Sequence, residues 1–181
     1  VPAHVVIALD EAYIEFLENK LDLVAEIASG VRPNLILMRT FSKIYGLAGL
    51  RIGYGIGHPE LIAALEKVRQ PFNINAISQA GALAALDDTN HVEKTQRINH
   101  RGMKFFTRAF KQLKLEVVPS AANFILVRVG DGAGVFSAMQ KLGVISRPMG
   151  GYQLSEWIRI SIGTPKENER CLDALKQVLQ H

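Results

Sequence analysis

The chain has 181 residues, of which 48% are hydrophobic and 21% are charged, a balance typical of globular proteins. Its net charge is +4 and its basic residues are scattered rather than clustered, which argues against a nucleic-acid-binding protein. No apolar run approaches the roughly 20 residues that cross a membrane, so we expect no membrane partner. The single cysteine, Cys171, excludes an internal disulfide and indicates a reducing compartment, which predicts a cytoplasmic protein.

The first half of the chain alternates apolar strands with helical patterns, which predicts a parallel sheet covered by helices. Residues 5–9 are apolar on both faces and predict an interior strand, followed by a helix over 15–29 and a second strand over 35–38. An interior strand needs neighbours on both sides and the sequence offers few, so we expect a missing amino-terminal portion. Residues 51–57 alternate glycine with larger side chains and predict a strand approached closely by other backbone.

Two more helices follow, and then the alternating pattern stops. Residues 59–68 predict an amphipathic helix with Leu61, Ile62, Leu65 and Val68 facing inward, whereas residues 76–86 predict a small-residue helix rich in alanine. The polar residues 87–90 break this helix and can cap the next one. We therefore place a domain boundary here, with residues 1–90 belonging to an α/β domain and residues 91–181 forming a smaller domain.

The smaller domain is predicted to be α+β, because its helices and strands do not alternate regularly. The expected helices cover residues 91–115, 134–142 and 165–179. The expected strands cover residues 116–118, 123–129, 144–147 and 157–162.

The residues that follow the second strand carry the clearest chemical meaning. Lys43 is preceded by hydroxyls at Thr40 and Ser42 and is followed by a guanidinium at Arg51. A lysine amine can form a Schiff base with an aldehyde, and hydroxyls together with a guanidinium can hold a phosphate. An aldehyde and a phosphate on one molecule describe pyridoxal 5′-phosphate (PLP). The ordinary alternative is a solvated loop built from turn residues.

A second stretch, at the end of the first strand, can supply the charge that such a cofactor needs. Asp10 and Tyr13 follow residues 5–9, so in a parallel sheet they would lie at the same edge as Lys43. Asp10 can face the pyridinium nitrogen of PLP, and Tyr13 can donate to its phenolate oxygen. The ordinary alternatives are a turn residue for Asp10 and a packed aromatic for Tyr13.

Four motifs occur along the chain in a fixed order: DEAY at 10–13, TFSK at 40–43, GLAGLRIGY at 46–54 and WIRISIGT at 157–164. Together they resemble the fold-type-I PLP-dependent aminotransferases, and among them the histidinol-phosphate aminotransferases. The resemblance implies the carboxyl-terminal half of a longer enzyme. Residues 1–90 would then be the end of a PLP-binding large domain with a mostly parallel sheet, and residues 91–181 the small carboxyl-terminal domain.

The resemblance implies a role at the cofactor for each matching residue of the first domain. Lys43 matches the lysine that forms the Schiff base with PLP. Asp10 matches the partner of the pyridinium nitrogen, and Tyr13 matches the partner of the phenolate oxygen. The residues that match the family's phosphate ligands are Thr40, Ser42 and Arg51.

The resemblance also implies the substrates and the assembly. Arg159 matches the arginine that binds the acidic end of the substrate, although unaided it would be interpreted as an exposed strand residue, and Arg147 matches a second arginine for the substrate phosphate. The implied reaction moves an amino group between histidinol phosphate and 2-oxoglutarate, in a homodimer. Aromatic amino-acid aminotransferases and threonine-phosphate decarboxylase share the motifs and remain alternatives, as does a fragment that holds no PLP.

The five histidines show no metal-ligand spacing, so no metal site is expected.

Overall fold

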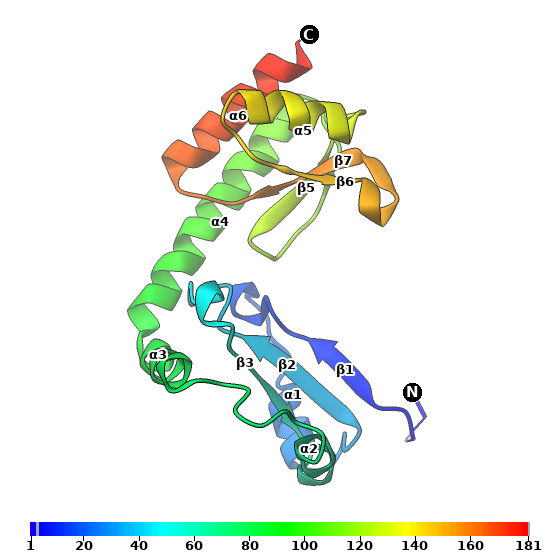
Figure 1. Cartoon of the computed structure of the whole chain (residues 1–181). Coiled ribbons are helices and arrows are strands. Elements are labelled where there is room, and N and C mark those ends of the chain that lie inside the picture. Colours follow the sequence, from blue (N-terminus) through cyan, green and yellow to red (C-terminus); the bar gives the residue numbers. More distant parts are fainter. Residues whose placement is uncertain (3, 181) are drawn as a thin grey trace. The chain divides into compact units, whose positions relative to one another are not determined.

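The computed structural model describes residues 1–2 and 4–180, so residue 181, the last of the predicted small domain, lies outside the described residues. The described chain forms two compact units that divide after Glu93 (Figure 1). Each unit has its own sheet and its own helices, which makes the chain a mixed α/β protein. Within the described ranges, no helix is long and apolar enough to cross a membrane.

The first unit holds a three-stranded sheet in the order β1–β2–β3. β1 (Ile7–Asp10) and β2 (Leu35–Thr40) are parallel, as the two apolar runs predict, and β3 (Gly53–Gly57) runs antiparallel to β2. The expected close approach to β3 is confirmed at Gly53, where an added Cβ would lie 2.6 Å from the carbonyl oxygen of Arg39. Only glycine fits this position without moving the backbone of β2.

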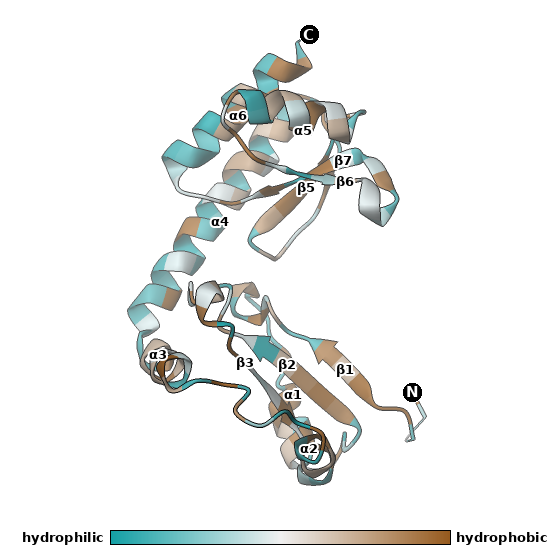
Figure 2. Ribbon diagram, in the orientation of Figure 1, coloured by the Kyte–Doolittle hydropathy of each residue, from teal (hydrophilic) through white to brown (hydrophobic). Residues whose placement is uncertain are grey.

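The core of the first unit lies between its sheet and α1 (Leu23–Ala28). Ile27 of α1 clusters with Leu35 and Leu37 of β2, and all three side chains are buried. Figure 2 shows β2 changing from hydrophobic to hydrophilic at its carboxyl end. The apolar part of the strand therefore anchors it in the core, and its polar end is presented at the edge of the sheet.

The helix predicted over residues 15–29 is wrong in its first half. This part contains only a short 3₁₀ helix, η1 (Ile14–Phe16), after which Leu17 takes an extended backbone with φ −73° and ψ 134°. α1 begins only after Asp22, whose carboxylate accepts a hydrogen bond at 3.1 Å from a backbone N–H of the first turn and thereby caps the helix. Leu21, expected on the buried face, is 77% exposed.

Two further helices follow the sheet of the first unit. α2 (Pro59–Glu66) and α3 (Ala76–Asp87) occur where helices are predicted. The expected burial of Leu65 and Val68 is wrong, because these side chains are 44% and 79% exposed. α2 ends before Val68, so the helical spacing that would have turned this side chain inward does not continue to it.

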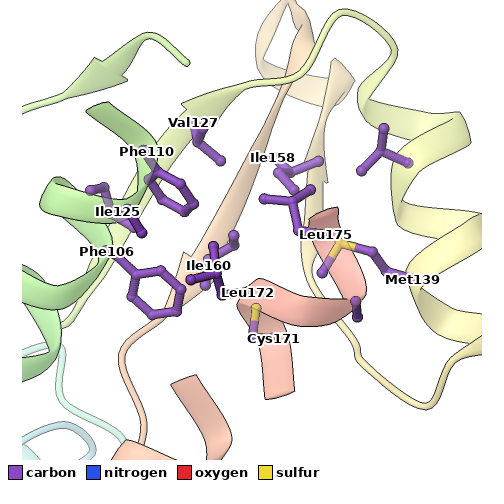
Figure 3. Close-up of a cluster of buried hydrophobic side chains, with 13 residues drawn as sticks. Phe106, Phe110, Ile125, Val127, Met139, Ile158, Ile160, Cys171, Leu172 and Leu175 are labelled. Atoms are coloured by element: carbon purple, nitrogen blue, oxygen red, sulfur yellow. The ribbon is translucent and has the colours of Figure 1, made fainter. Parts of the chain in front are cut away.

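The second unit is built on a four-stranded antiparallel sheet in the order β4–β5–β7–β6. The strands are β4 (Val117–Val118), β5 (Phe124–Arg128), β6 (Arg147–Met149) and β7 (Leu154–Ser161). The helices are α4 (Thr89–Gln112), which begins in the first unit, α5 (Gly132–Lys141) and α6 (Pro165–Leu179). Buried side chains from β5, β7 and all three helices form one hydrophobic core (Figure 3). α6 begins where predicted, since Thr164 and Glu167 form a capping box.

The strand predicted over residues 144–147 lies further along the chain. The backbone N–H of Val144 donates to the carbonyl oxygen of Met139 at 3.0 Å, so this residue closes the end of α5 instead of joining the sheet. β6 therefore starts only at Arg147. It accommodates Pro148, which lacks a backbone N–H, because β6 is an edge strand.

The thiol of Cys171 belongs to the core of the second unit, where the residue is 9% exposed. Burial raises the pKa of this thiol to about 11, so the thiolate is a minute fraction at pH 8. We expect an aromatic disulfide reagent to label Cys171 slowly in the native protein and rapidly in denaturing urea, as followed by release of the coloured thiol. Labelling that is equally fast in both conditions would contradict the packing shown in Figure 3.

Candidate active site

The residues predicted to hold a cofactor lie at one edge of the sheet of the first unit. β1 ends at Asp10 and β2 ends at Thr40, and Asp10 pairs with Met38 in the parallel register. β3 begins at Gly53, opposite Thr40, so Arg51 just before it reaches the same edge. The expectation that both stretches follow the carboxyl ends of neighbouring parallel strands is confirmed. Such edges are where open α/β sheets bind ligands.

Lys43 lies in the loop between β2 and β3 and meets the turn that follows β1. Its Nζ is 5.3 Å from the centroid of the Tyr13 ring. A cation over the face of an aromatic ring is attracted by the electrons of the ring, so Tyr13 helps to orient the amine. Lys43 is exposed, which leaves its amine accessible to a ligand.

Asp10 and Thr40 also shape their own turns, as the ordinary alternatives predict. Oδ1 of Asp10 accepts a hydrogen bond from the Ala12 N–H at 2.9 Å, and Oγ1 of Thr40 accepts one from the Ser42 N–H at 3.0 Å. These bonds use one carboxylate oxygen of Asp10 and a lone pair of Thr40. Asp10 therefore keeps its second oxygen, and Thr40 keeps its hydroxyl proton, so the turn role and a ligand role are compatible.

Arg51 has an unusual backbone conformation. Its φ of 51° and ψ of 47° lie in the left-handed region, which costs a residue with a Cβ roughly 1–2 kcal/mol. Its Nη1 donates to the carbonyl oxygen of Ala48 at 2.9 Å, and its backbone N–H reaches the same oxygen at 3.4 Å. Phe72, Lys114 and Gln153 also have a positive φ, so it is the combination of this strained backbone with a place at the sheet edge beside a cleft that makes Arg51 a candidate for a ligand contact.

A cleft of about 560 Å³ opens beside Arg51. Residues 49–51 line one side, and residues 73–78, which lead into α3, line the other. The surface of the cleft is mostly apolar, and its polar lining residues are Arg51, Asn73, Asn75 and Ser78, of which the guanidinium of Arg51 is the group suited to an anion.

An ion pair braces the two strand ends that carry the candidate residues. Nε of Arg39 donates to the Glu11 carboxylate at 2.8 Å, and Glu11 is 6% exposed. Burial alone would lower the pKa of the Arg39 guanidinium, but the interactions with Glu11 and Tyr54 outweigh burial and leave this pKa raised. Glu11 directly follows Asp10, so the pair fixes the end of β1 against the end of β2.

We expect Glu11→Ala to destabilise the first unit by about 2 kcal/mol. Removing one partner of a fully buried ion pair costs roughly 3–5 kcal/mol. The loss is reduced here because the Arg39 side chain is 22% exposed and can regain water. Hydrogen exchange of the β1 and β2 amides measures the change.

The matched control is Glu66→Ala, which breaks a bond of the same 2.8 Å length to Arg69. Those two side chains are 54% and 49% exposed, so we expect a change of no more than about 0.5 kcal/mol. Equal effects of the two substitutions would show that the Glu11 pair does not brace the strand ends.

The two arginines predicted to bind substrate lie opposite each other in the second unit. Arg147 on β6 pairs with Arg159 on β7. The Arg147 guanidinium donates to the Tyr152 hydroxyl at 3.1 Å and lies 5.5 Å from the centroid of that ring. The Arg159 guanidinium lies 4.9 Å from the centroid of the Phe124 ring.

Arg159 has a further feature that points to a ligand. Its Nε is buried and has no hydrogen-bond partner among the described residues. Buried N–H groups are nearly always bonded, and neighbouring like charges on adjacent strands repel each other. An anion between Arg147 and Arg159 would accept a hydrogen bond from the Nε of Arg159 and would reduce the repulsion between the two positive charges. Across residues 1–2 and 4–180, no group of three or more His, Cys, Asp or Glu side chains could hold a metal ion.

Reasoning from the sequence missed several residues that shape the site. Glu11 and Arg39 form their ion pair across strands, and Ser78 donates its hydroxyl to the Leu50 carbonyl oxygen at 2.8 Å. A charged residue directly at the end of an apolar strand is a signal that could have drawn attention to Glu11 and Arg39. A serine within an alanine-rich helix gives no such signal.

The known proteins similar to this chain include aminotransferases. The family "Aminotransferase class I and II" matches residues 2–175. A histidinol-phosphate aminotransferase from Akkermansia muciniphila is 51% identical over 179 residues, which cover 99% of this chain and 49% of that protein. The chain therefore spans about half the length of the curated relatives it matches.

Solved structures give the same picture. A putative histidinol-phosphate aminotransferase from Erwinia carotovora matches with a TM-score of 0.90 at 30% identity, over 99% of this chain and 52% of that one. The histidinol-phosphate aminotransferase from Sinorhizobium meliloti, solved in complex with pyridoxal-5′-phosphate, matches with a TM-score of 0.87 at 32% identity, over 99% of this chain and 50% of that one.

Proposed function

The chain belongs to the class I and II aminotransferases, and we propose from this that it carries the cofactor lysine of a PLP-dependent histidinol-phosphate aminotransferase. The proposed reaction converts histidinol phosphate and 2-oxoglutarate to imidazole-acetol phosphate and glutamate, a step of histidine biosynthesis. The observation that carries the proposal is the convergence of Lys43, Asp10 and Arg51 on one edge of the sheet.

The residues at this edge fit PLP in the chemistry of their donors. The accessible amine of Lys43 suits the aldehyde of the cofactor. The free carboxylate oxygen of Asp10 suits the ring nitrogen, and Arg51, with its strained backbone beside a cleft, suits the phosphate. When bound, PLP supplies an electron sink that stabilises negative charge on the substrate.

Each side chain then has a defined task. The amine of Lys43 would hold the aldehyde of the cofactor and could take and return the proton at the substrate α-carbon as a general base and acid. Asp10 would pair with the protonated ring nitrogen, and Tyr13 would donate to the phenolate oxygen. The side chains proposed to bind the cofactor phosphate are those of Thr40, Ser42 and Arg51.

Substrate recognition is assigned to the arginine pair of the second unit. The guanidinium groups of Arg159 and Arg147 can bind the substrate phosphate or a carboxylate, and the buried Nε of Arg159 supports this assignment.

We also propose that residues 1–90 and 91–181 are the large-domain and small-domain parts of the enzyme. A homodimer in the cytoplasm completes the proposal. Val68, Phe72 and Ile77, which are 79%, 99% and 76% exposed, support a protein contact on the first unit.

A substrate comparison tests the proposal. The protein to assay is this chain joined to the half of the Akkermansia relative that it does not cover. Histidinol phosphate, phenylalanine and threonine phosphate are compared as substrates, and we expect the highest kcat/KM with histidinol phosphate. Preference for phenylalanine would identify an aromatic aminotransferase, and release of carbon dioxide from threonine phosphate would identify a decarboxylase. A joined protein that stays colourless with added PLP would contradict the assignment of the cofactor.

A further inference from the structure

The left-handed conformation of Arg51 needs support from outside its own loop. Both hydrogen bonds that Arg51 itself donates end on the carbonyl oxygen of Ala48, three residues earlier. They close the η2 turn (Ala48–Leu50) but do not tie it to the rest of the unit. Backbone hydrogen bonds hold the loop on either side of Arg51, from the Leu47 N–H to the Phe41 carbonyl oxygen at 2.9 Å and from the Phe41 N–H to the Ile52 carbonyl oxygen at 3.2 Å. The peptide group that leads into Arg51 is held separately, through the carbonyl of Leu50.

Ser78 of α3 holds this carbonyl. Its Oγ donates to the Leu50 carbonyl oxygen at 2.8 Å, across 28 residues of chain. Ser78 is 1% exposed, so the bond is shielded from water. Leu50 C=O and Arg51 N–H belong to the same planar peptide group. Holding the oxygen therefore fixes the plane whose rotation would change the φ of Arg51.

The start of α3 is arranged around this contact. The Asn75 side chain caps the helix and accepts a hydrogen bond from the Ser78 N–H at 2.8 Å. The Leu50 side chain packs against α3 at Gly81, where an added Cβ would lie 2.7 Å from Cδ1 of Leu50. Asn75, Ser78 and Gly81 are spaced by three residues, so they serve one side of the helix.

We propose that Ser78 is a positioning residue that holds Arg51 in its left-handed conformation and so keeps the guanidinium at the sheet edge for the cofactor phosphate, beside the cleft lined by residues 49–51 and 73–78. The inference rests on the proposed function, in which Arg51 binds the phosphate of PLP. Ser78 and Arg51 both line that cleft. Without the hydroxyl, the Leu50–Arg51 peptide keeps only the 3.4 Å hydrogen bond from the Arg51 N–H to the Ala48 carbonyl oxygen, so the guanidinium is held less firmly toward the phosphate.

The test compares PLP with pyridoxal, which lacks the phosphate, in the joined protein described above. Binding is followed by the near-visible absorbance of the protein-bound cofactor, which does not depend on turnover. We expect Ser78→Ala to weaken PLP binding about 10-fold, the effect of losing one buried hydrogen bond, and to leave pyridoxal binding unchanged. Ser78→Thr, which keeps the hydroxyl, should restore most of the PLP affinity. Gln79→Ala, at an exposed neighbour on the same helix, is the matched control and should change neither affinity.

A double substitution separates positioning from general support of the fold. If Ser78 acts through Arg51, Ser78→Ala should have no further effect on PLP affinity in a protein that already carries Arg51→Ala. Equal losses for PLP and pyridoxal, or additive effects of the two substitutions, would overturn the inference while leaving the proposed function standing. Failure of the unsubstituted joined protein to bind PLP would overturn both.

Discussion

Lys43→Ala is expected to abolish transamination in the joined protein, lowering kcat by roughly 10⁴-fold or more. The substitution removes the amine that holds the cofactor and moves the proton at the substrate α-carbon. The same protein should lose the yellow colour that a lysine-bound cofactor gives. Lys43 is exposed and its Nζ contacts the Tyr13 ring at 5.3 Å, so the fold should change little. Steady-state assays and absorbance spectra measure the two effects.

Lys67→Ala is the matched control for this substitution, since Lys67 is also an exposed lysine of the first unit, at the end of α2. It should leave the colour and kcat unchanged. A Lys43→Ala protein that keeps its visible band and its turnover would remove Lys43 from the proposed mechanism.

Substitution of Asp10 is expected to have the second largest effect on kcat, because it removes a negative charge. Asp10 is exposed on this chain, and if the joined half buries its ion pair with the ring nitrogen, that pair is worth roughly 3–5 kcal/mol, so Asp10→Ala should lower kcat by about 10²–10⁴-fold. Asp10 also accepts the Ala12 N–H at 2.9 Å, so the alanine variant loses a turn contact as well. Asp10→Asn keeps that contact and removes only the charge. The asparagine variant should therefore lose nearly as much activity as the alanine variant.

Asp22 provides the control for Asp10. It caps α1 with a hydrogen bond of 3.1 Å, so Asp22→Ala should cost about 1 kcal/mol of stability without reducing kcat. Full turnover in Asp10→Asn would contradict the role of Asp10 as the partner of the ring nitrogen. It would leave that residue with the turn role that the sequence also allowed.

The parts of the fold that could be predicted depend on local patterns. Two apolar runs followed by Asp10 and Thr40 were enough to predict a parallel pair with polar residues at one edge. The start of the helix at residue 165 was likewise predicted from a local signal, and the structure shows a capping box of Thr164 and Glu167 there, whose partners lie within one helical turn.

The helix over residues 15–29 could not be predicted from periodicity alone. Leu17 and Leu21 have helical spacing, but the cap at Asp22 starts the helix later and leaves Leu21 exposed. Local capping therefore overrode the hydrophobic pattern.

Contacts between residues far apart in the sequence limited how much of the candidate site could be predicted. Glu11 and Arg39 are 28 residues apart, and their pairing follows from the register of β1 with β2. The bond from Ser78 to Leu50 also spans 28 residues and depends on how α3 packs. The sequence identified the chemically reactive side chains, whereas the residues that position them became visible only in three dimensions.

The central claim is that the amine of Lys43 bonds to the aldehyde of a phosphorylated pyridine cofactor. Borohydride reduction of the PLP-saturated joined protein, followed by peptide mass spectrometry, tests it directly because the reduced bond survives digestion. The account predicts one phosphopyridoxyl group per chain, on the peptide that contains Lys43. Modification of a different lysine with Lys43 unmodified, or no stable modification at all, would contradict it.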